Sequence, residues 1–178
     1  MKYTYWRYFI DYEKEEKWLN SLSAKGLALV NVSLLRYTFE ECEQAEYEYR
    51  LELLNNLPGN IESKIYIRFL EESHIEHISS TFRWIYLRKN KKYGSFNLFS
   101  DNKSRIDHIK RYIKLLLPLI ILNLFCGIKI LNDSLKFNIS SIIYLGSINI
   151  VLSISLTYFA VKRIIVMKRL KKENIIHE

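Results

Sequence analysis

The sequence feature that most constrains this chain is a long run without any charged side chain near its C-terminal end. From Ile139 to Val161, twenty-three consecutive residues include no Asp, Glu, Lys, Arg or His. A helix of this length extends about 34 Å, which is enough to cross the ~30 Å hydrocarbon layer of a bilayer. We therefore expect residues 139–161 to form a transmembrane helix.

A second apolar segment, from Tyr112 to Leu131, precedes this run. Lys114 and Lys129 lie near its two ends, where their alkyl chains can follow the apolar helix and place the ammonium groups among lipid headgroups. The alternative, a pair of buried helices in a soluble protein, requires a protein core on every side of each helix. The rest of the chain is too short to surround two such helices, so we expect a transmembrane hairpin.

The net charge of +8 comes from the C-terminal part of the chain. Residues 1–100 contain fourteen basic and fourteen acidic side chains, whereas residues 101–178 contain thirteen basic and five acidic ones. The basic residues flank the predicted spans, and the loop between the spans contains only Lys136 and Asp133 as charged residues. The positive-inside rule therefore predicts a protein of the cell membrane with both termini in the cytoplasm and with membrane lipids as partners of its basic segments. Because the positive charge lies at helix ends and not on a folded face, it does not indicate nucleic-acid binding.

These patterns divide the chain into six predicted segments. They are a cytoplasmic domain (1–100), a basic juxtamembrane linker (101–111), transmembrane helix 1 (112–131), a short outside loop (132–138), transmembrane helix 2 (139–161) and a basic cytoplasmic tail (162–178). The second span contains many small or polar residues, which let helices approach closely and form hydrogen bonds with each other. These residues either pack against the first span or mediate self-association or contact with a protein partner. The candidates for an intermolecular contact are Asn123 and Asn149.

Residues 1–100 show the alternating patterns of strands and helices. The clearest strand pattern is Glu46–Leu54, where apolar or aromatic residues alternate with charged ones. Asp11 and Asn60 are candidate N-caps of two helices. The second helix is predicted from apolar residues at every fourth position, Ile61, Ile65 and Phe69. The patterns predict an α+β fold: a two-layer sandwich of a mostly antiparallel sheet and two helices, for which a ferredoxin-like arrangement is one candidate, followed by a two-helix transmembrane hairpin.

Several short segments of this region together resemble a known family. They are FIDYEKEEKWLN (9–20), AKG (24–26), RYTFE (36–40), YRLELL (49–54), RWIYLRK (83–89) and FNLFSD (96–101). In this order, the segments resemble the bacterial domain-of-unknown-function family 2812. The resemblance implies two membrane spans after the domain, and PadR-like transcriptional regulators encoded nearby, hence a regulatory or envelope-stress setting. It implies no established activity, and the sequence departs from the family pattern at Leu27, where Trp is expected.

The sequence contains no residue pattern typical of catalysis or of metal binding. His74 and His77 are spaced so that they could bind a divalent ion, but they straddle the predicted end of a helix and no third ligand is indicated. Neither Cys42 nor Cys126 has a His near it in sequence, and the five glycines form no phosphate-binding loop. We therefore expect no catalytic residues, no metal, no cofactor and no enzymatic activity.

The domain is rich in aromatic residues, with ten Tyr, three Trp and six Phe in residues 1–100. Tyr and Trp are frequent both in protein cores and at binding hot spots, so these residues form either a core with phenol groups at its rim or a binding face. The candidates for binding a partner or ligand are Trp6, Trp18, Tyr47, Tyr49, Trp84 and Tyr86. The expected function is that of a membrane-anchored regulatory or protein-interaction module. The alternatives are a sensor of a small molecule or lipid and, with less support, a membrane-bound enzyme.

Overall fold

The computed structural model describes residues 1–99, 101–137 and 142–177. The chain divides into two compact units, Met1–Ser100 and Asp101–Glu178, and each is described by itself. Parts of several predicted segments lie outside the described residues. These are residue 100 of the predicted domain, residue 138 of the predicted loop, residues 139–141 of the predicted second span and residue 178 of the predicted tail.

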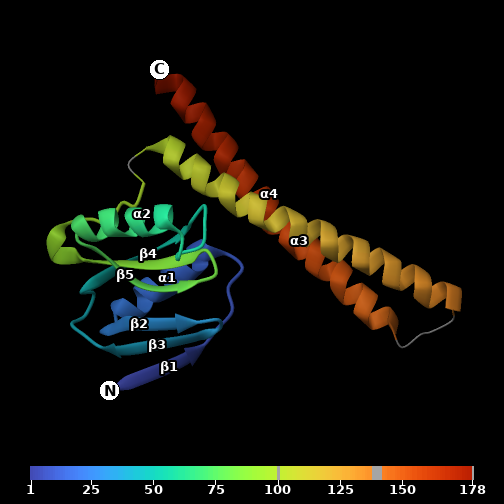
Figure 1. Ribbon diagram of the computed structural model, residues 1–178, viewed down its shortest axis with the longest axis horizontal. Helices are drawn as coiled ribbons and strands as arrows, with labels where there is room; N and C mark the ends of the chain where they lie inside the picture. The colour runs from blue at the N-terminus through green and yellow to red at the C-terminus, as the bar shows by residue number, and fades with distance from the viewer. Residues whose placement is uncertain (100, 138–141, 178) are drawn as a thin grey trace. The chain divides into compact units, whose positions relative to one another are not determined.

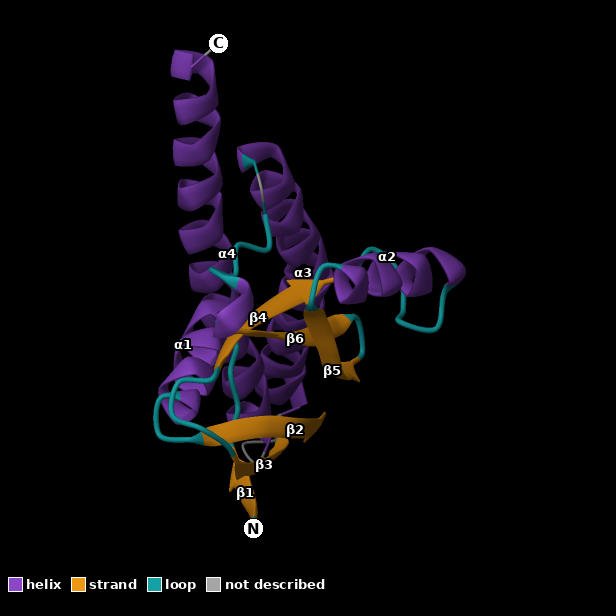
Figure 2. Ribbon diagram, turned by 90° about the vertical axis from the view of Figure 1, so that its left-hand side faces the viewer, coloured by secondary structure: helices purple, strands orange, loops and turns teal. Residues whose placement is uncertain are grey.

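The first unit consists of two consecutive β-α-β-β halves (Figures 1 and 2). The first half contains β1 (Lys2–Trp6), α1 (Tyr12–Ser23), β2 (Leu27–Ser33) and β3 (Arg36–Glu41). The second half contains β4 (Tyr47–Leu53), α2 (Ile61–Glu72), β5 (Ile75–Thr81) and β6 (Trp84–Asn90), followed by the 3-10 turn η1 (Lys91–Tyr93). In each half the last strand lies between the other two and is antiparallel to both, which gives the sheet orders β1-β3-β2 and β4-β6-β5.

The α+β class predicted from the sequence is confirmed, but the strands form two sheets. A ferredoxin-like arrangement combines four strands and two helices in one βαββαβ unit. The six described strands are instead divided equally between two three-stranded sheets, so this arrangement is not the one observed. Figure 2 shows β4, β5 and β6 grouped apart from β1, β2 and β3.

The two halves also agree in local detail. Each first hairpin strand has an irregularity in its register, between Leu29 and Asn31 in β2 and between His77 and Ser79 in β5. Each hairpin then turns through a large apolar residue with a positive φ, Leu34 at 52° and Phe82 at 57°. Large side chains rarely adopt this left-handed conformation, because the Cβ atom crowds the backbone. The domain is therefore a structural repeat whose halves share even their strained positions.

Both helices of the domain begin at the N-caps predicted from the sequence. The carboxylate of Asp11 accepts a hydrogen bond from the N–H of Glu13 (3.2 Å), and Oδ1 of Asn60 accepts one from the N–H of Glu62 (2.9 Å). Each cap satisfies a backbone donor that has no partner inside the first helical turn. The local sequence therefore determines where α1 and α2 start.

The two helices lie in different layers. Figure 1 shows α1 between the two sheets and α2 on the other face of the second sheet. The main core surrounds α1 and takes side chains from both halves: Leu19, Leu22, Leu29, Val32, Tyr37, Phe39, Tyr49, Leu51 and Tyr86. A smaller core lies beneath α2 and contains Leu54, Leu70, Ile75, Ile85, Leu87 and Phe96. Because both halves contribute to the main core, they form one domain.

The apolar stripe that predicts α2 lies on the exposed side of this helix. Ile61, Ile65 and Phe69 are 75%, 65% and 59% exposed, whereas Leu70 is buried in the smaller core. Residues at every third or fourth position share one helix face, so α2 has two apolar faces on opposite sides. The periodicity correctly predicts a helix at this position, which extends from Ile61 to Glu72, but it does not identify the face that packs.

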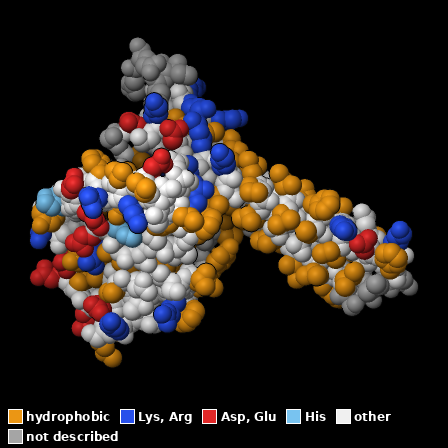
Figure 3. Space-filling model, viewed as in Figure 1, with side chains coloured by type: hydrophobic (Ala, Val, Ile, Leu, Met, Phe, Trp, Pro, Cys, Tyr) orange, Lys and Arg blue, Asp and Glu red, His pale blue; other side chains and the backbone are white. Residues whose placement is uncertain are grey.

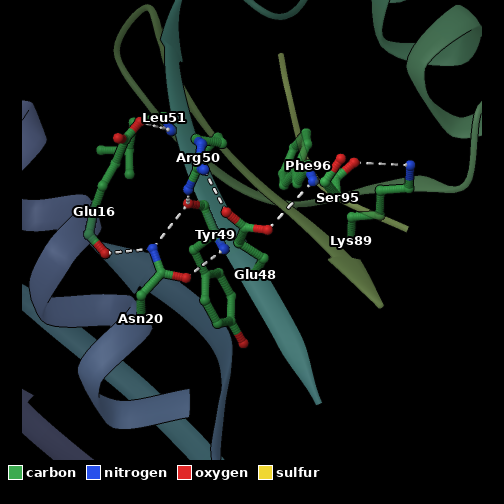
Figure 4. Close-up of polar contacts among 9 residues, drawn as sticks. All are labelled: Glu16, Asn20, Glu48, Tyr49, Arg50, Leu51, Lys89, Ser95 and Phe96. Atoms are coloured by element: carbon green, nitrogen blue, oxygen red, sulfur yellow. Dashed lines mark hydrogen bonds and ion pairs between the residues drawn. The ribbon is translucent and has the colours of Figure 1, made fainter. Parts of the chain in front are cut away.

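Helix α1 also covers the free edge of strand β4 (Figure 4). Nδ2 of Asn20 donates to the carbonyl oxygen of Tyr49 (3.1 Å), and its Oδ1 accepts from the Tyr49 N–H (2.9 Å). Oε1 of Glu16 accepts from the N–H of Leu51 (2.8 Å). These side chains take the place of a neighbouring strand, so the edge cannot easily pair with another chain.

The two sheets meet at a seam between the edge strands β2 and β5. The hydroxyl of Ser79 donates to the carbonyl oxygen of Val32 (2.9 Å) and lies 3.2 Å from the Val32 N–H, from which it accepts. The hydroxyl of Tyr49 accepts from the Leu29 N–H (2.8 Å) in the same strand. Side chains therefore satisfy these backbone groups of β2 where a continuous sheet would use another strand.

The second unit is a pair of long helices, α3 (Asn102–Phe137) and α4 (Ile143–His177), which run side by side in opposite directions. With 36 and 35 residues, each helix is about 50 Å long and exceeds the thickness of a bilayer core. Residues 102–111 and 132–137 belong to α3, and residues 162–177 belong to α4. The helices thus continue through the predicted linker, the described part of the loop, and the tail.

Both helices are long and apolar enough to cross a membrane. In their most apolar segments of eighteen residues, the mean hydropathy is 2.1 and 1.8, and 11% and 22% of the residues are buried. The core helix of a soluble protein would be mostly buried, because apolar side chains on all sides need apolar contacts on all sides. Figure 3 shows hydrophobic side chains along the outside of this helix pair.

Small and polar residues join α3 to α4. A Cβ atom added to Gly127 would lie 2.7 Å from Cδ1 of Ile150, and one added to Gly146 would lie 2.9 Å from side-chain atoms of α3. The hydroxyl of Ser153 donates to the carbonyl oxygen of Ile120 on the other helix (3.1 Å). Close approach and hydrogen bonding between the helices are the usual roles of such residues in membrane helices. At these positions, they pack two helices of the same chain.

Candidate functional site

The domain contains an open cavity of about 660 Å³ beside the seam between the two sheets. Its walls come from β2, from the end of β3 and the loop after it, and from β4, β5 and β6. A cavity of this volume is in the range of ligand-binding sites. Its lining includes five glutamates, Glu40, Glu41, Glu43, Glu46 and Glu76. We call this cavity the acidic cleft.

Few cations neutralise the glutamates of the acidic cleft. Among the described residues, ion pairs reach Glu40, whose Oε1 lies 3.5 Å from Nζ of Lys2, and Glu76, which pairs with Arg88. Glu46 accepts a neutral hydrogen bond from Nδ2 of Asn90 (3.0 Å). A concave surface with an excess of one charge concentrates ions of the opposite charge. The acidic cleft is therefore suited to a cationic ligand.

Arg88 forms the wall of the cleft on strand β6 and contacts three neighbours. Its Nε and Nη2 each lie 2.7 Å from Oε2 of Glu76, and its Nη1 donates to the carbonyl oxygen of Leu29 (3.3 Å). The guanidinium also lies over the ring of Tyr47, 4.3 Å from the ring centroid. Such planar contacts are typical of an arginine that is fixed in position. Because Leu29 belongs to the first half, Arg88 joins the two halves of the domain at the cleft.

Two reactive types of side chain, Cys42 and His77, line the cleft. The pKa of the Cys42 thiol is raised, first by burial and then by the negative charge of Glu46, so the thiol is protonated at neutral pH. Burial lowers the pKa of His77, whose Nε2 lies 2.7 Å from Oγ of Ser80. A protonated thiol is a poor nucleophile.

His74 and His77 lie in different surroundings. His74 follows the end of α2 with a φ of 60°, and its ring stacks on Tyr93 with the centroids 4.2 Å apart. His77 lies in β5 and lines the acidic cleft. Within the described part of the chain, no group of three or more metal-ligating side chains is found.

The six aromatic residues predicted as binding candidates lie in four environments. Tyr47 lines the acidic cleft, Tyr49 and Tyr86 are buried in the main core, Trp18 and Trp84 are half-buried against that core, and Trp6 is 70% exposed. The structure therefore does not bring the six together on one surface. Of this set, Tyr47 is the residue that contributes to the cleft.

The buried tyrosines use their hydroxyl groups inside the core. Tyr37 and Tyr86 both donate to Oε1 of Glu15, at 2.7 and 2.8 Å. Burial raises the pKa of Glu15, and it raises the pKa of Tyr49 to about 12. A buried carboxyl group needs hydrogen-bond donors, and the two phenols supply them. Much of the aromatic content is thus explained by a core built around Glu15.

The two asparagines predicted for an intramembrane contact bond within their own helices. Nδ2 of Asn123 donates to the carbonyl oxygen of Leu119, and Nδ2 of Asn149 donates to that of Leu145, both at 2.8 Å. Both side chains are half-buried. Each amide therefore has one hydrogen bond inside its own helix.

Part of the acidic cleft has a signal in the amino-acid sequence. Residues 40–46 (EECEQAE) contain four glutamates within seven positions. Glu46 directly precedes β4 and lies on the charged side of the alternation predicted for Glu46–Leu54, which is compatible with an open cleft. Glu76 and Arg88 come from later strands, and only the pairing of the two halves at the seam brings them to the same cavity.

The comparisons with known proteins concern the family of the chain. The model of the family described as "Protein of unknown function (DUF2812)" matches residues 11–121, which include most of the domain and the first part of α3. No curated protein and no solved structure matches the chain. Because the match covers more than half of the sequence, this chain belongs to the DUF2812 family.

Proposed function

We propose that this protein is a membrane-anchored regulatory module that binds a partner protein without catalysing a reaction. Helices α3 and α4 hold the domain at the cytoplasmic face of the cell membrane, and the acidic cleft binds a cationic segment of the partner. The observation that carries the proposal is the 660 Å³ cleft lined by five glutamates. A transcriptional regulator or a component of an envelope-stress response is the class of partner that fits the family resemblance.

The charges of the helix pair support the cytoplasmic location. Basic residues are concentrated at the end where α3 begins and α4 ends, whereas Lys129, Asp133 and Lys136 are the charged residues near the other end. Loops and helix ends that are rich in Lys and Arg stay in the cytoplasm. Anionic lipids on that face attract the same residues.

The contacts inside the cleft support binding of a cation. Arg88 is already engaged by Glu76, Leu29 and Tyr47, so its charge offsets only part of the acidic lining. Carboxylates in a cleft interact more strongly with a ligand than carboxylates on a flat surface, because less water screens them. A Lys or Arg side chain of a partner would satisfy groups such as Glu43 and Glu46.

The test is the affinity of the detergent-solubilised full chain for a peptide rich in Lys and Arg, measured by calorimetry. Replacing Glu43→Gln or Glu46→Gln removes one negative charge and is expected to weaken binding about fivefold, and added salt weakens it further. Glu72→Gln is the matched control, because Glu72 is exposed at the end of α2 and does not line the cleft. Absence of binding, or equal effects of all three variants, would contradict the proposal.

A second candidate function is the sensing of a small cationic molecule, and the size of the cleft favours it. The same titration with a polyamine or a cationic amphiphile distinguishes the two functions. A ligand that binds the folded protein raises its thermal stability by an amount that grows with the logarithm of the ligand concentration divided by the dissociation constant. Tighter binding of the small cation than of the peptide, with the same loss in Glu46→Gln, would select the sensor.

Labelling with a membrane-impermeant maleimide tests the orientation. In a Cys126→Ser background, a cysteine introduced by Asn132→Cys is expected to react in intact cells, whereas Cys42 reacts only after lysis. Cys42 lies in the domain, and Asn132 is an exposed residue near the end of α3. The reverse pattern would place the domain outside the cell.

Self-association through the membrane helices is the remaining part of the proposal. Asn123 and Asn149 each retain an amide oxygen, and such groups can bond between helices. Replacing both with Leu is expected to reduce crosslinking between copies in vesicles. Unchanged crosslinking would assign these residues to the single chain.

A further inference from the structure

The end of the first sheet carries a cluster of exposed apolar and aromatic side chains. Trp6, Tyr8, Leu34 and Leu35 are 70%, 67%, 78% and 45% exposed. The backbone holds them together: Trp6 is the register partner of Arg36, and the N–H of Arg7 donates to the carbonyl oxygen of Leu35 (2.9 Å). We call this cluster of Trp6, Tyr8, Leu34 and Leu35 the apolar tip.

The conformation of Leu34 makes its exposure more informative. Its φ of 52° is a left-handed conformation that Gly or Asn adopts at lower cost. A leucine here is therefore unfavourable for the turn, and it is also unfavourable in water. Residues kept in such positions are candidates for a functional contact.

The charges around the apolar tip indicate what it contacts. Arg7 and Arg36 are exposed beside it, and residues 1–10 and 27–39 contain no Asp or Glu. Trp and Tyr favour the boundary between lipid and water, Leu favours the acyl region below it, and Arg favours anionic headgroups. This combination matches an anionic membrane surface, whereas the acidic cleft elsewhere in the domain matches cations.

A short length of chain joins the domain to the predicted first span. Phe99, the last described residue of the domain, precedes Tyr112 by thirteen positions. Of these positions, Asn102 to Tyr112 belong to α3 and rise about 15 Å at 1.5 Å per residue. This rise is smaller than the diameter of a domain of this size, whose radius of gyration is about 13 Å, so the surface of the domain can reach the membrane.

The second half of the domain supplies an internal comparison. Its hairpin turns through Phe82 with the same positive φ, and Phe82 is 62% exposed. However, the next residue, Arg83, donates inward from Nε to the carbonyl oxygen of Leu54 (2.8 Å). The second turn therefore has one exposed apolar side chain, and the guanidinium of its own arginine is directed into the domain.

We propose that the apolar tip inserts into the cytoplasmic membrane–water interface, with Leu34 and Trp6 below the headgroups and Arg7 and Arg36 among them. This inference rests on the membrane anchoring proposed above, but it is independent of ligand binding in the acidic cleft. Insertion gives the domain a second attachment to the membrane in addition to α3. It thereby limits the directions in which the cleft can face.

The experiment uses the full chain, with Cys42→Ser and Cys126→Ser, reconstituted into vesicles that contain phosphatidylglycerol. A polarity-sensitive fluorophore is attached after Leu34→Cys or, as the matched control, after Phe82→Cys. We expect the probe at position 34 to be quenched by brominated lipid and the probe at position 82 by aqueous iodide. Adding Arg36→Gln should lower the ratio of inserted to free tip about fivefold, since one Arg near an anionic surface contributes that factor.

The other outcomes overturn the inference. If the chain floats with the vesicles but iodide quenches the probe at position 34, the tip is in water and only the anchoring stands. If neither quencher reaches that probe, protein covers the tip. If the chain does not float with vesicles, the anchoring fails, and the inference fails with it. Binding of the basic peptide by the unmodified chain reports separately on the cleft.

Discussion

The two halves of the domain have the same strand order, the same type of hairpin turn and helices of twelve residues each, yet they bury their helices differently. Helix α1 lies between the two sheets and contributes Leu19 and even a carboxyl group, Glu15, to the main core. Helix α2 covers one outer face and leaves Ile61, Ile65 and Phe69 exposed. Two halves with the same topology therefore need not have the same stability, because the position of a helix among the layers decides how much of its surface is buried.

The largest expected effect tests this difference between the helices. Leu19→Ala removes a fully buried side chain from the main core and is expected to cost about 3 kcal/mol of unfolding free energy. Ile65→Ala removes a side chain of equal size from the exposed face of α2 and should change stability by less than about 0.5 kcal/mol. Denaturant unfolding of the full chain in micelles, followed by Trp fluorescence, measures both. Equal losses would show that the outer face of α2 is covered in the intact protein.

The carboxyl group of Glu15 should be the next most sensitive point. Glu15→Ala leaves the hydroxyls of Tyr37 and Tyr86 without their acceptor and is expected to cost about 2–3 kcal/mol. Glu72→Ala, on the exposed end of α2, is the control and should have little effect. A loss of the same size in both variants would mean that general charge, and not the buried hydrogen bonds, is responsible.

Glu15 should also make stability depend on pH. Burial raises its pKa above the ordinary value of 4.5, so the folded state holds this proton at a pH where the unfolded state has released it. The contribution of Glu15 to stability is therefore complete below pH 4.5 and declines as the pH rises through the folded-state pKa. Glu15→Gln, which cannot titrate, should flatten this part of the profile. An unchanged slope in the variant would assign the titration to another group.

The sequence allows the local structure to be predicted better than the assembly. Capping by Asp11 and Asn60, and the alternation in Glu46–Leu54, are short-range signals, and the structure has the helices and the strand that they indicate. The sequence does not predict strand β5, because residues 75–81 are largely polar and the register shifts between His77 and Ser79. Without β5 the six strands cannot be divided into two sheets, so the repeat was not visible.

The candidate site could be predicted only in part for the same reason. The sequence predicts Tyr47 as a binding candidate, and Tyr47 lines the cleft. The glutamates of residues 40–46 reach the same cavity as Glu76 and Arg88 only because β2 and β5 meet at the seam. Such contacts between distant segments depend on the packing of whole sheets, and neither periodicity nor spacing encodes them locally.

A substitution at the seam between the halves should have an intermediate effect on the free energy of unfolding. Ser79→Ala removes the hydroxyl that bonds both backbone groups of Val32, so a buried N–H and carbonyl lose their partner. We expect a loss of about 1–2 kcal/mol and weaker binding of the basic peptide, because β2 and β5 form two walls of the cleft. Ser33→Ala, in an exposed residue at the end of β2, is the control in the same measurements. If Ser79→Ala is neutral, water replaces the hydroxyl and the seam is not held by this side chain.

Substitutions in the two strained turns should have the smallest effect on stability, and they should differ most clearly in their effect on membrane contact. Leu34→Asn and Phe82→Asn each place a residue that tolerates a positive φ at a position where φ is 52° or 57°, so each should raise stability by about 0.5–1 kcal/mol. Thermal unfolding in micelles measures both gains.

In vesicles, however, only Leu34→Asn should reduce the quenching of tryptophan by brominated lipid, because Trp6 belongs to the apolar tip and Phe82 lies at the other turn. A gain in stability with a loss of membrane contact is the pattern of a residue kept for function against its own conformational preference. If both variants gain stability and neither changes the quenching, Leu34 has no role at the membrane, and its strained conformation is only a feature that the two turns share. The two halves then differ only in how they bury their helices.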